Sequence, residues 1–122
     1  MRLTMKISRL APNLFAGAQI APRDLNMLAE EGFTDIVCHR PDSEHADGPV
    51  SAKVSTAAER LGLRFHYQPI TPGAPYATQA EALKRLTTRP GAKVFAYCRS
   101  GGRVAQAWTL AQTPQREHAR QA

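Results

Sequence analysis

The sequence predicts an α/β protein with a central, mainly parallel sheet of four or five strands flanked by helices. Short apolar runs alternate with segments in which apolar residues recur at helical spacing. Strands that alternate with helices in this way form a parallel sheet through crossover connections. The apolar run 94–97 leads into a glycine-containing turn and then a second helical segment, which indicates a strand, a tight loop and a helix.

The expected elements follow in order along the chain. Two short strands, 5–10 and 13–18, are separated by Pro12, which is tolerated at a sheet edge. The remaining strands are expected at 33–38, 63–70 and 94–97, and the helices at 22–31, 50–61, 78–88 and 104–112. A capping box, Thr78 to Glu81, is expected to open the third helix. We expect one domain over 1–113 and a frayed tail over 114–122.

Length and composition are those of one globular domain. The chain has 122 residues, of which 43% are hydrophobic and 21% charged. No apolar run is long enough to span a membrane and the N-terminus lacks a signal-peptide pattern, so we expect a cytoplasmic protein without a membrane partner. The net charge of +6 favours small anionic substrates. Nucleic acid is not expected, because no basic run is interleaved with aromatic residues.

The loop from Cys98 to Arg103 is the candidate active site. Backbone N–H groups of such a turn point into one concavity, and the N-terminus of the following helix adds partial positive charge. Arg99, Ser100, Gly101 and Gly102 would form this anion-binding loop. Cys98 at one end is placed as a thiolate nucleophile, and Arg103 at the other supplies a forked donor for an oxyanion.

The sequence Cys-Arg-Ser-Gly-Gly-Arg over 98–103 resembles the loop of the beta-lactamase-hydrolase-like protein, phosphatase-like domain family. Upstream, the segments 17–25, 31–33, 40–44 and 62–69 resemble landmarks of this family in the family's order. The resemblance covers roughly residues 5 to 112 and implies the fold of dual-specificity and tyrosine phosphatases. It also implies a nucleophilic role for Cys98 and an oxyanion-binding role for Arg103.

Two thiolate reactions are compatible with such a loop. Tyrosine and dual-specificity phosphatases are similar in having five residues between cysteine and arginine, whereas this chain and the rhodanese sulfurtransferases have four. Segment 71–77, where phosphatases carry an acidic residue, has none, and Asp42 is the substitute candidate for a general acid. We therefore expect sulfur transfer through a Cys98 persulfide first, phosphomonoester hydrolysis second, and a non-catalytic oxyanion-binding module third.

Further site residues follow from this reading. The loop after the strand 33–38 would place His39 and Arg40 at the lining of the site, because ligands bind at the carboxyl ends of parallel strands. Cys38, at the end of that strand, is a candidate resolving thiol for Cys98. The substrate would be a sulfane-sulfur donor or a phosphoester, with an acceptor thiol in the first case. We expect no metal and no cofactor, since the spacing of the acidic and histidine residues matches no metal motif.

Overall fold

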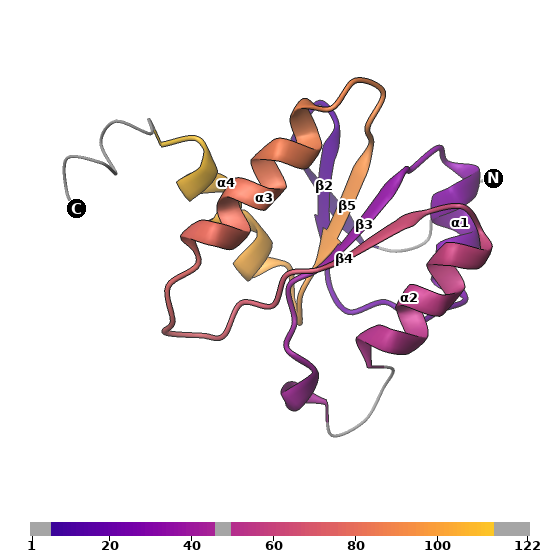
Figure 1. Ribbon diagram of the computed structural model, residues 1–122, viewed down its shortest axis with the longest axis horizontal. Helices are drawn as coiled ribbons and strands as arrows, with labels where there is room; N and C mark the ends of the chain where they lie inside the picture. Colours follow the sequence, from indigo (N-terminus) through magenta and orange to yellow (C-terminus); the bar gives the residue numbers. More distant parts are fainter. Residues whose placement is uncertain (1–5, 46–49, 114–122) are drawn as a thin grey trace.

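The computed structural model describes residues 6–45 and 50–113. Within them the chain forms a five-stranded sheet in the order β1-β2-β5-β3-β4, flanked by helices (Figure 1). The strand β1 is antiparallel to β2, and the other neighbours are parallel. The elements are β1 (Ile7–Ala11), β2 (Leu14–Gly17), α1 (Asp24–Glu30), β3 (Asp35–Cys38), η1 (Asp42–Glu44), α2 (Ser51–Arg60), β4 (Arg64–Tyr67), α3 (Ala77–Thr88), β5 (Val94–Tyr97) and α4 (Gly102–Ala111).

The sheet separates two hydrophobic cores. Figure 1 shows α3 and α4 on one face and α1 and α2 on the other. All four residues of β5 are buried. Because side chains alternate along a strand, Val94 and Ala96 pack in the core under α3 and α4, while Phe95 and Tyr97 pack in the core under α1 and α2. Burial on both faces explains why this strand has no charged side chain.

The predicted fold class and the order of the elements are confirmed. The capping box is wrong: α3 begins at Ala77, so Thr78 lies inside its first turn, and the preceding Tyr76 makes no side-chain cap. The backbone N–H of Ala80 instead donates to the carbonyl of Tyr76, which starts the helix one residue early. The helix α4 also begins earlier than expected, at Gly102. The predicted tail 114–122 lies outside the described residues.

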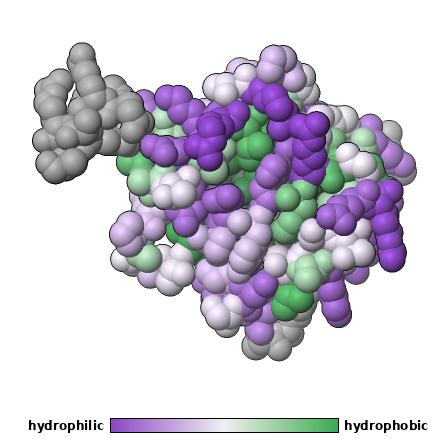
Figure 2. All heavy atoms as spheres, in the orientation of Figure 1, coloured by the Kyte–Doolittle hydropathy of each residue, from purple (hydrophilic) through white to green (hydrophobic). Residues whose placement is uncertain are grey.

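The visible face of the molecule is largely hydrophilic, with apolar side chains in separate areas (Figure 2). Among the large hydrophobic residues described, Leu61 and Tyr67 are exposed, at 39% and 42%. The other apolar side chains that carry the fold lie in the two cores. Within 6–45 and 50–113, no helix has the length and apolarity that crossing a bilayer demands.

A buried carboxylate fixes the amino-terminal end of the sheet. Asp35, at the start of β3, is 0% exposed. It accepts a hydrogen bond from Thr34 Oγ1 at 2.6 Å, lies 2.7 Å from His66 Nε2, and pairs with the guanidinium of Arg89. Burial alone would raise the pKa of Asp35, but the hydrogen bonds from Arg89, Thr34 and His66 outweigh it and lower the pKa. The cluster joins β3, β4 and the end of α3.

Replacing Asp35 by asparagine should destabilise the protein by about 2 kcal/mol at neutral pH, because Arg89 and His66 lose their charged partner. A group whose pKa is lowered by folding stabilises above its unfolded pKa, and that stability is lost as pH falls through the folded value. The difference in the free energy of unfolding between wild type and Asp35→Asn should therefore shrink as the pH falls from about 5 to about 2. Urea unfolding across this range measures it, with the exposed Glu59→Gln as control. A constant difference would contradict the assignment.

Candidate active site

The predicted loop 98–103 lies between the end of β5 and the start of α4. Cys98 continues the line of β5, and its backbone N–H donates to the carbonyl of Gly17 on β2 at 3.3 Å. Its side chain is 1% exposed and belongs to the core under α3 and α4. The N–H of Gly101 turns back and donates to Cys98 Sγ at 3.0 Å. An N–H aimed at sulfur stabilises the thiolate more than the thiol, since the anion is the stronger acceptor.

The backbone conformation at Gly101 requires a glycine. Its φ of +99° lies in the left-handed region that favours glycine. A Cβ there would also stand 3.6 Å from the backbone of Gly17, in ordinary contact. The backbone conformation, and not the space for a side chain, therefore sets the requirement. Arg99 and Ser100 are exposed beside this turn, and Gly102 N–H lies 3.5 Å from Ser100 Oγ.

Arg103 lies in the first turn of α4, and a carboxylate and a carbonyl hold its guanidinium. Its Nη1 and Nη2 donate to the two carboxylate oxygens of Glu44 at 2.9 and 2.8 Å, and Nη1 also donates to the carbonyl of Ile70 at 2.9 Å. The hydrogen bond and charge of Glu44 raise the pKa of Arg103. Guanidinium has five N–H donors. The Nε–H and the second Nη2–H have no hydrogen-bond partner among the described residues, which leaves one edge for a bidentate oxyanion.

Glu44 is a site residue that the sequence did not identify. It lies at the end of η1, far from Arg103 in the sequence, and pairs with it across the site. Arg40 contacts the same residue, because its Nη2 donates to the Glu44 carbonyl at 3.2 Å and its Nε lies 3.5 Å from the carboxylate. Arg103 and Arg40 together lower the pKa of Glu44. The available signal was an acidic residue in the loop that follows β3, and it did not distinguish Glu44 from its acidic neighbours.

Asp42 caps a helix in this structure. One carboxylate oxygen accepts from Ser51 N–H at 2.8 Å and the other from Ser51 Oγ at 2.9 Å, at the start of α2. Its own N–H donates to the hydroxyl of Tyr67 at 3.0 Å. Both oxygens are thus engaged by Ser51, the first residue of α2, so the carboxylate binds the amino-terminal end of that helix. Nothing in these contacts brings the carboxyl group to Cys98.

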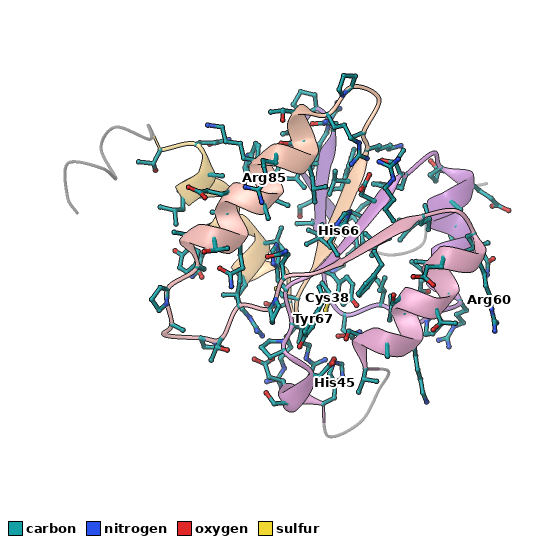
Figure 3. The ribbon with its side chains drawn as sticks, viewed as in Figure 1. Cys38, His45, Arg60, His66, Tyr67 and Arg85 are labelled. Atoms are coloured by element: carbon teal, nitrogen blue, oxygen red, sulfur yellow. The ribbon has the colours of Figure 1, made fainter. Side chains whose placement is uncertain are left out.

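The two cysteines lie on opposite faces of the sheet. Cys38 pairs with Tyr97, one residue before Cys98, so alternation directs the two thiols apart. Cys38 packs in the core under α1 and α2 and Cys98 in the core under α3 and α4. Cys38 Sγ donates to the Arg40 carbonyl at 3.3 Å, and burial raises its pKa. Figure 3 shows Cys38 at the end of the sheet that carries the site, near Tyr67. A disulfide with Cys98 would require backbone movement, so the structure does not support Cys38 as a resolving thiol.

Two hollows flank the loop. One, of about 410 Å³, is bounded by the segment 70–76 and by Arg103 and Gln106. The other, of about 520 Å³, lies between the first two strands and residues Ser100, Gly101 and Ala105. The hollows thus border Ser100, Gly101 and Arg103 of the candidate loop, while Cys98 lines neither of them. Within the described ranges, no three residues among histidine, cysteine, aspartate and glutamate gather as metal ligands.

Replacing Glu44 by glutamine should weaken oxyanion binding about tenfold, because the amide keeps the shape but loses one charge-assisted contact that orients Arg103. Calorimetric titration with sulfate or vanadate measures this, and Glu81→Gln on α3 is a control outside the loop and its flanking hollows. Equal affinities for wild type and Glu44→Gln would show that Arg103 does not need this partner.

The chain is similar to known proteins in sequence and in fold. A beta-lactamase hydrolase-like protein of Agrobacterium fabrum is 28% identical over 108 residues, which covers 87% of this chain and 25% of that protein. The chain thus spans about a quarter of the length of the curated relatives it matches. A solved Neisseria meningitidis protein assigned as a phosphatase has a TM-score of 0.73 and 29% identity, covering 88% of this chain and 75% of that one.

A second solved structure, a DUF442 protein from Shewanella putrefaciens, has a TM-score of 0.76 at 18% identity and covers 93% of this chain and 75% of that one. At this identity the likeness shows the fold alone. The sequence also matches the beta-lactamase hydrolase-like protein, phosphatase-like domain family over residues 6–115. The chain therefore belongs to that family, whose fold is that of the cysteine-dependent phosphatases.

Proposed function

We propose that this chain is a cysteine-thiolate enzyme that transfers sulfur through a persulfide on Cys98. The contact from Gly101 N–H to Cys98 Sγ supports a thiolate at that position. The open edge of Arg103 supports binding of a small oxyanion, such as thiosulfate, next to it. The positive net charge of the chain attracts such substrates.

We favour sulfur transfer over phosphate hydrolysis because the carboxyl groups near the site are already bound by other residues. A phosphatase needs an acid that protonates the leaving oxygen. Among the described residues, Asp42 is bound by Ser51 and Glu44 by Arg103, while segment 71–77 contains no carboxyl group. Sulfur transfer has no such requirement, because sulfite leaves as a stable anion.

The proposed reaction has two steps. The Cys98 thiolate attacks the sulfane sulfur of thiosulfate, an S–S bond forms, and sulfite departs with the electron pair of the bond that breaks. An acceptor, either cyanide in an assay or a thiolate, then attacks the outer sulfur of the persulfide. Cys98 leaves as a thiolate and is ready for the next cycle. Arg103 would bind the oxygens of the sulfonate group during the first step.

Phosphomonoester hydrolysis is the second candidate. It is favoured by the phosphatase-like family and by the Neisseria meningitidis relative assigned as a phosphatase. In that reaction the Cys98 thiolate attacks phosphorus, and water later releases phosphate from the phosphocysteine. The two candidates share the nucleophile and the anion site and differ in their need for an acid.

Purified protein given thiosulfate and cyanide should release thiocyanate, and Cys98→Ser should reduce the rate to background because serine does not form the persulfide. Cys38→Ser is the matched control and should retain the rate, since its thiol faces the other core. Colorimetric detection of thiocyanate measures the rate for each variant, and the intact mass of the protein after thiosulfate treatment shows whether the persulfide forms. Turnover of an aryl phosphate without thiocyanate release would reverse the order of the two candidates.

Asp42→Asn separates the two reactions further. It should leave thiocyanate release within about twofold of wild type and lower stability by about 1 kcal/mol, because only a helix cap is weakened. If Asp42 were a phosphatase acid, the same change should reduce aryl phosphate turnover by about 100-fold or more. Steady-state rates with thiosulfate and with an aryl phosphate distinguish the two roles of Asp42. Asp24→Asn, which alters the first turn of α1, serves as control. A large loss of thiocyanate release would contradict the capping role.

A further inference from the structure

The imidazole of His39 has a buried nitrogen without a partner. His39 is 0% exposed. Its Nδ1 lies 2.7 Å from the carbonyl oxygen of Gln68, and a carbonyl only accepts, so Nδ1 carries the hydrogen and Nε2 keeps the lone pair. Within residues 6–45 and 50–113, Nε2 is buried with no hydrogen-bond partner. Buried polar atoms are nearly always paired, so this nitrogen requires an explanation.

The backbone places His39 beside Cys98. The N–H of His39 donates to the carbonyl of Tyr97 at 2.8 Å, which extends the pairing of β3 with β5 beyond the last strand residue. Val37 is the partner of Ala96 in this ladder, and two steps further along both strands His39 stands opposite Cys98. Side chains two residues apart share a face, and Val37, Ala96 and Cys98 belong to one core. The imidazole and the thiol therefore leave the sheet on the same side.

The surroundings keep this imidazole neutral at rest. Burial lowers the pKa of His39, and the positive charge of Arg103 lowers it further, although the hydrogen bond that Nδ1 donates to the Gln68 carbonyl acts in the opposite direction. The charged and titratable groups around it are Cys98, which directly follows β5, and Arg103 on α4, with Glu44 bound to Arg103 and Arg40 next in the chain. A neutral imidazole with a free lone pair is the form that accepts a proton.

We infer that His39 is the proton acceptor for the Cys98 thiol. The inference rests on the proposed role of Cys98 as nucleophile, and it applies equally to sulfur transfer and to phosphate hydrolysis. The proton of the thiol passes to Nε2 across one water, because the two atoms are not hydrogen-bonded to each other in the structure, and sulfur keeps the electron pair. An imidazolium then stands beside a thiolate, whose charge offsets the repulsion from Arg103 and is shared with the Gly101 N–H.

His39→Asn tests this role with little change of packing, because the asparagine amide can still donate to the Gln68 carbonyl while Nε2 is removed. The measurement is the alkylation rate of Cys98 by iodoacetamide against pH, in a Cys38→Ser background, followed by mass spectrometry. At about pH 6.5 the rate should fall about tenfold, and the loss should shrink as the pH rises, because hydroxide can then take the proton in place of His39. Superimposable profiles would overturn the inference.

The control is His66→Asn, which removes the imidazole on β4 whose Nε2 lies 2.7 Å from Asp35 at the start of β3 (Figure 3). Its profile should match the parent, and an equal shift would mean that His39 acts only through the fold. Should His39→Asn fail to fold, ¹⁵N-histidine NMR of the parent and of Cys98→Ala provides the test. The titration midpoint of His39 should differ between them, and identical midpoints would refute the coupling.

Alkylation requires no turnover, so this test is independent of the thiocyanate assay. A His39-dependent profile in a protein that releases no thiocyanate would sustain the inference and refute sulfur transfer. Thiocyanate release together with an alkylation profile that does not depend on His39 would support sulfur transfer and refute the role of His39.

Discussion

The bidentate pairing of Arg103 with Glu44 is the interaction on which the geometry of the site depends. It joins the first turn of α4 to η1, two segments that follow different strands of the sheet. The additional bond from Arg103 to the Ile70 carbonyl brings in the chain that follows β4. Three connections that leave neighbouring strands are thereby held around one guanidinium. The donor edge that remains open has a fixed direction, which is what recognition of a planar or tetrahedral oxyanion needs.

The sheet supplies the other half of this geometry. Because β5 is central and buried on both faces, Cys98 directly follows a strand that is held by a neighbour on each side. Gly101 then reverses the chain immediately, so that an amide meets the sulfur before α4 begins. Local conformation therefore positions the nucleophile and tertiary contacts position the arginine. The two are brought together because β5 and α4 are consecutive along the chain.

Sequence patterns identified the fold class, the order of strands and helices, and the loop with its cysteine and arginine, because these depend on local periodicity and on a contiguous motif. They did not identify Glu44, since its role arises from a contact across 59 residues. The capping box failed because the chain starts α3 at Ala77, where backbone hydrogen bonds suffice. The relation between Cys38 and Cys98 depends on strand register, which hydrophobic patterns alone leave open.

The separation of the two thiols by the sheet has a chemical consequence. An oxidised or sulfur-loaded Cys98 has no internal thiol on its own face among the described residues with which to exchange. Its regeneration would then depend on a thiol or other nucleophile delivered from solution. The lifetime of the modified cysteine would follow the concentration of that reductant in the surroundings, so the strand register would couple the resting state of the protein to the redox poise outside it.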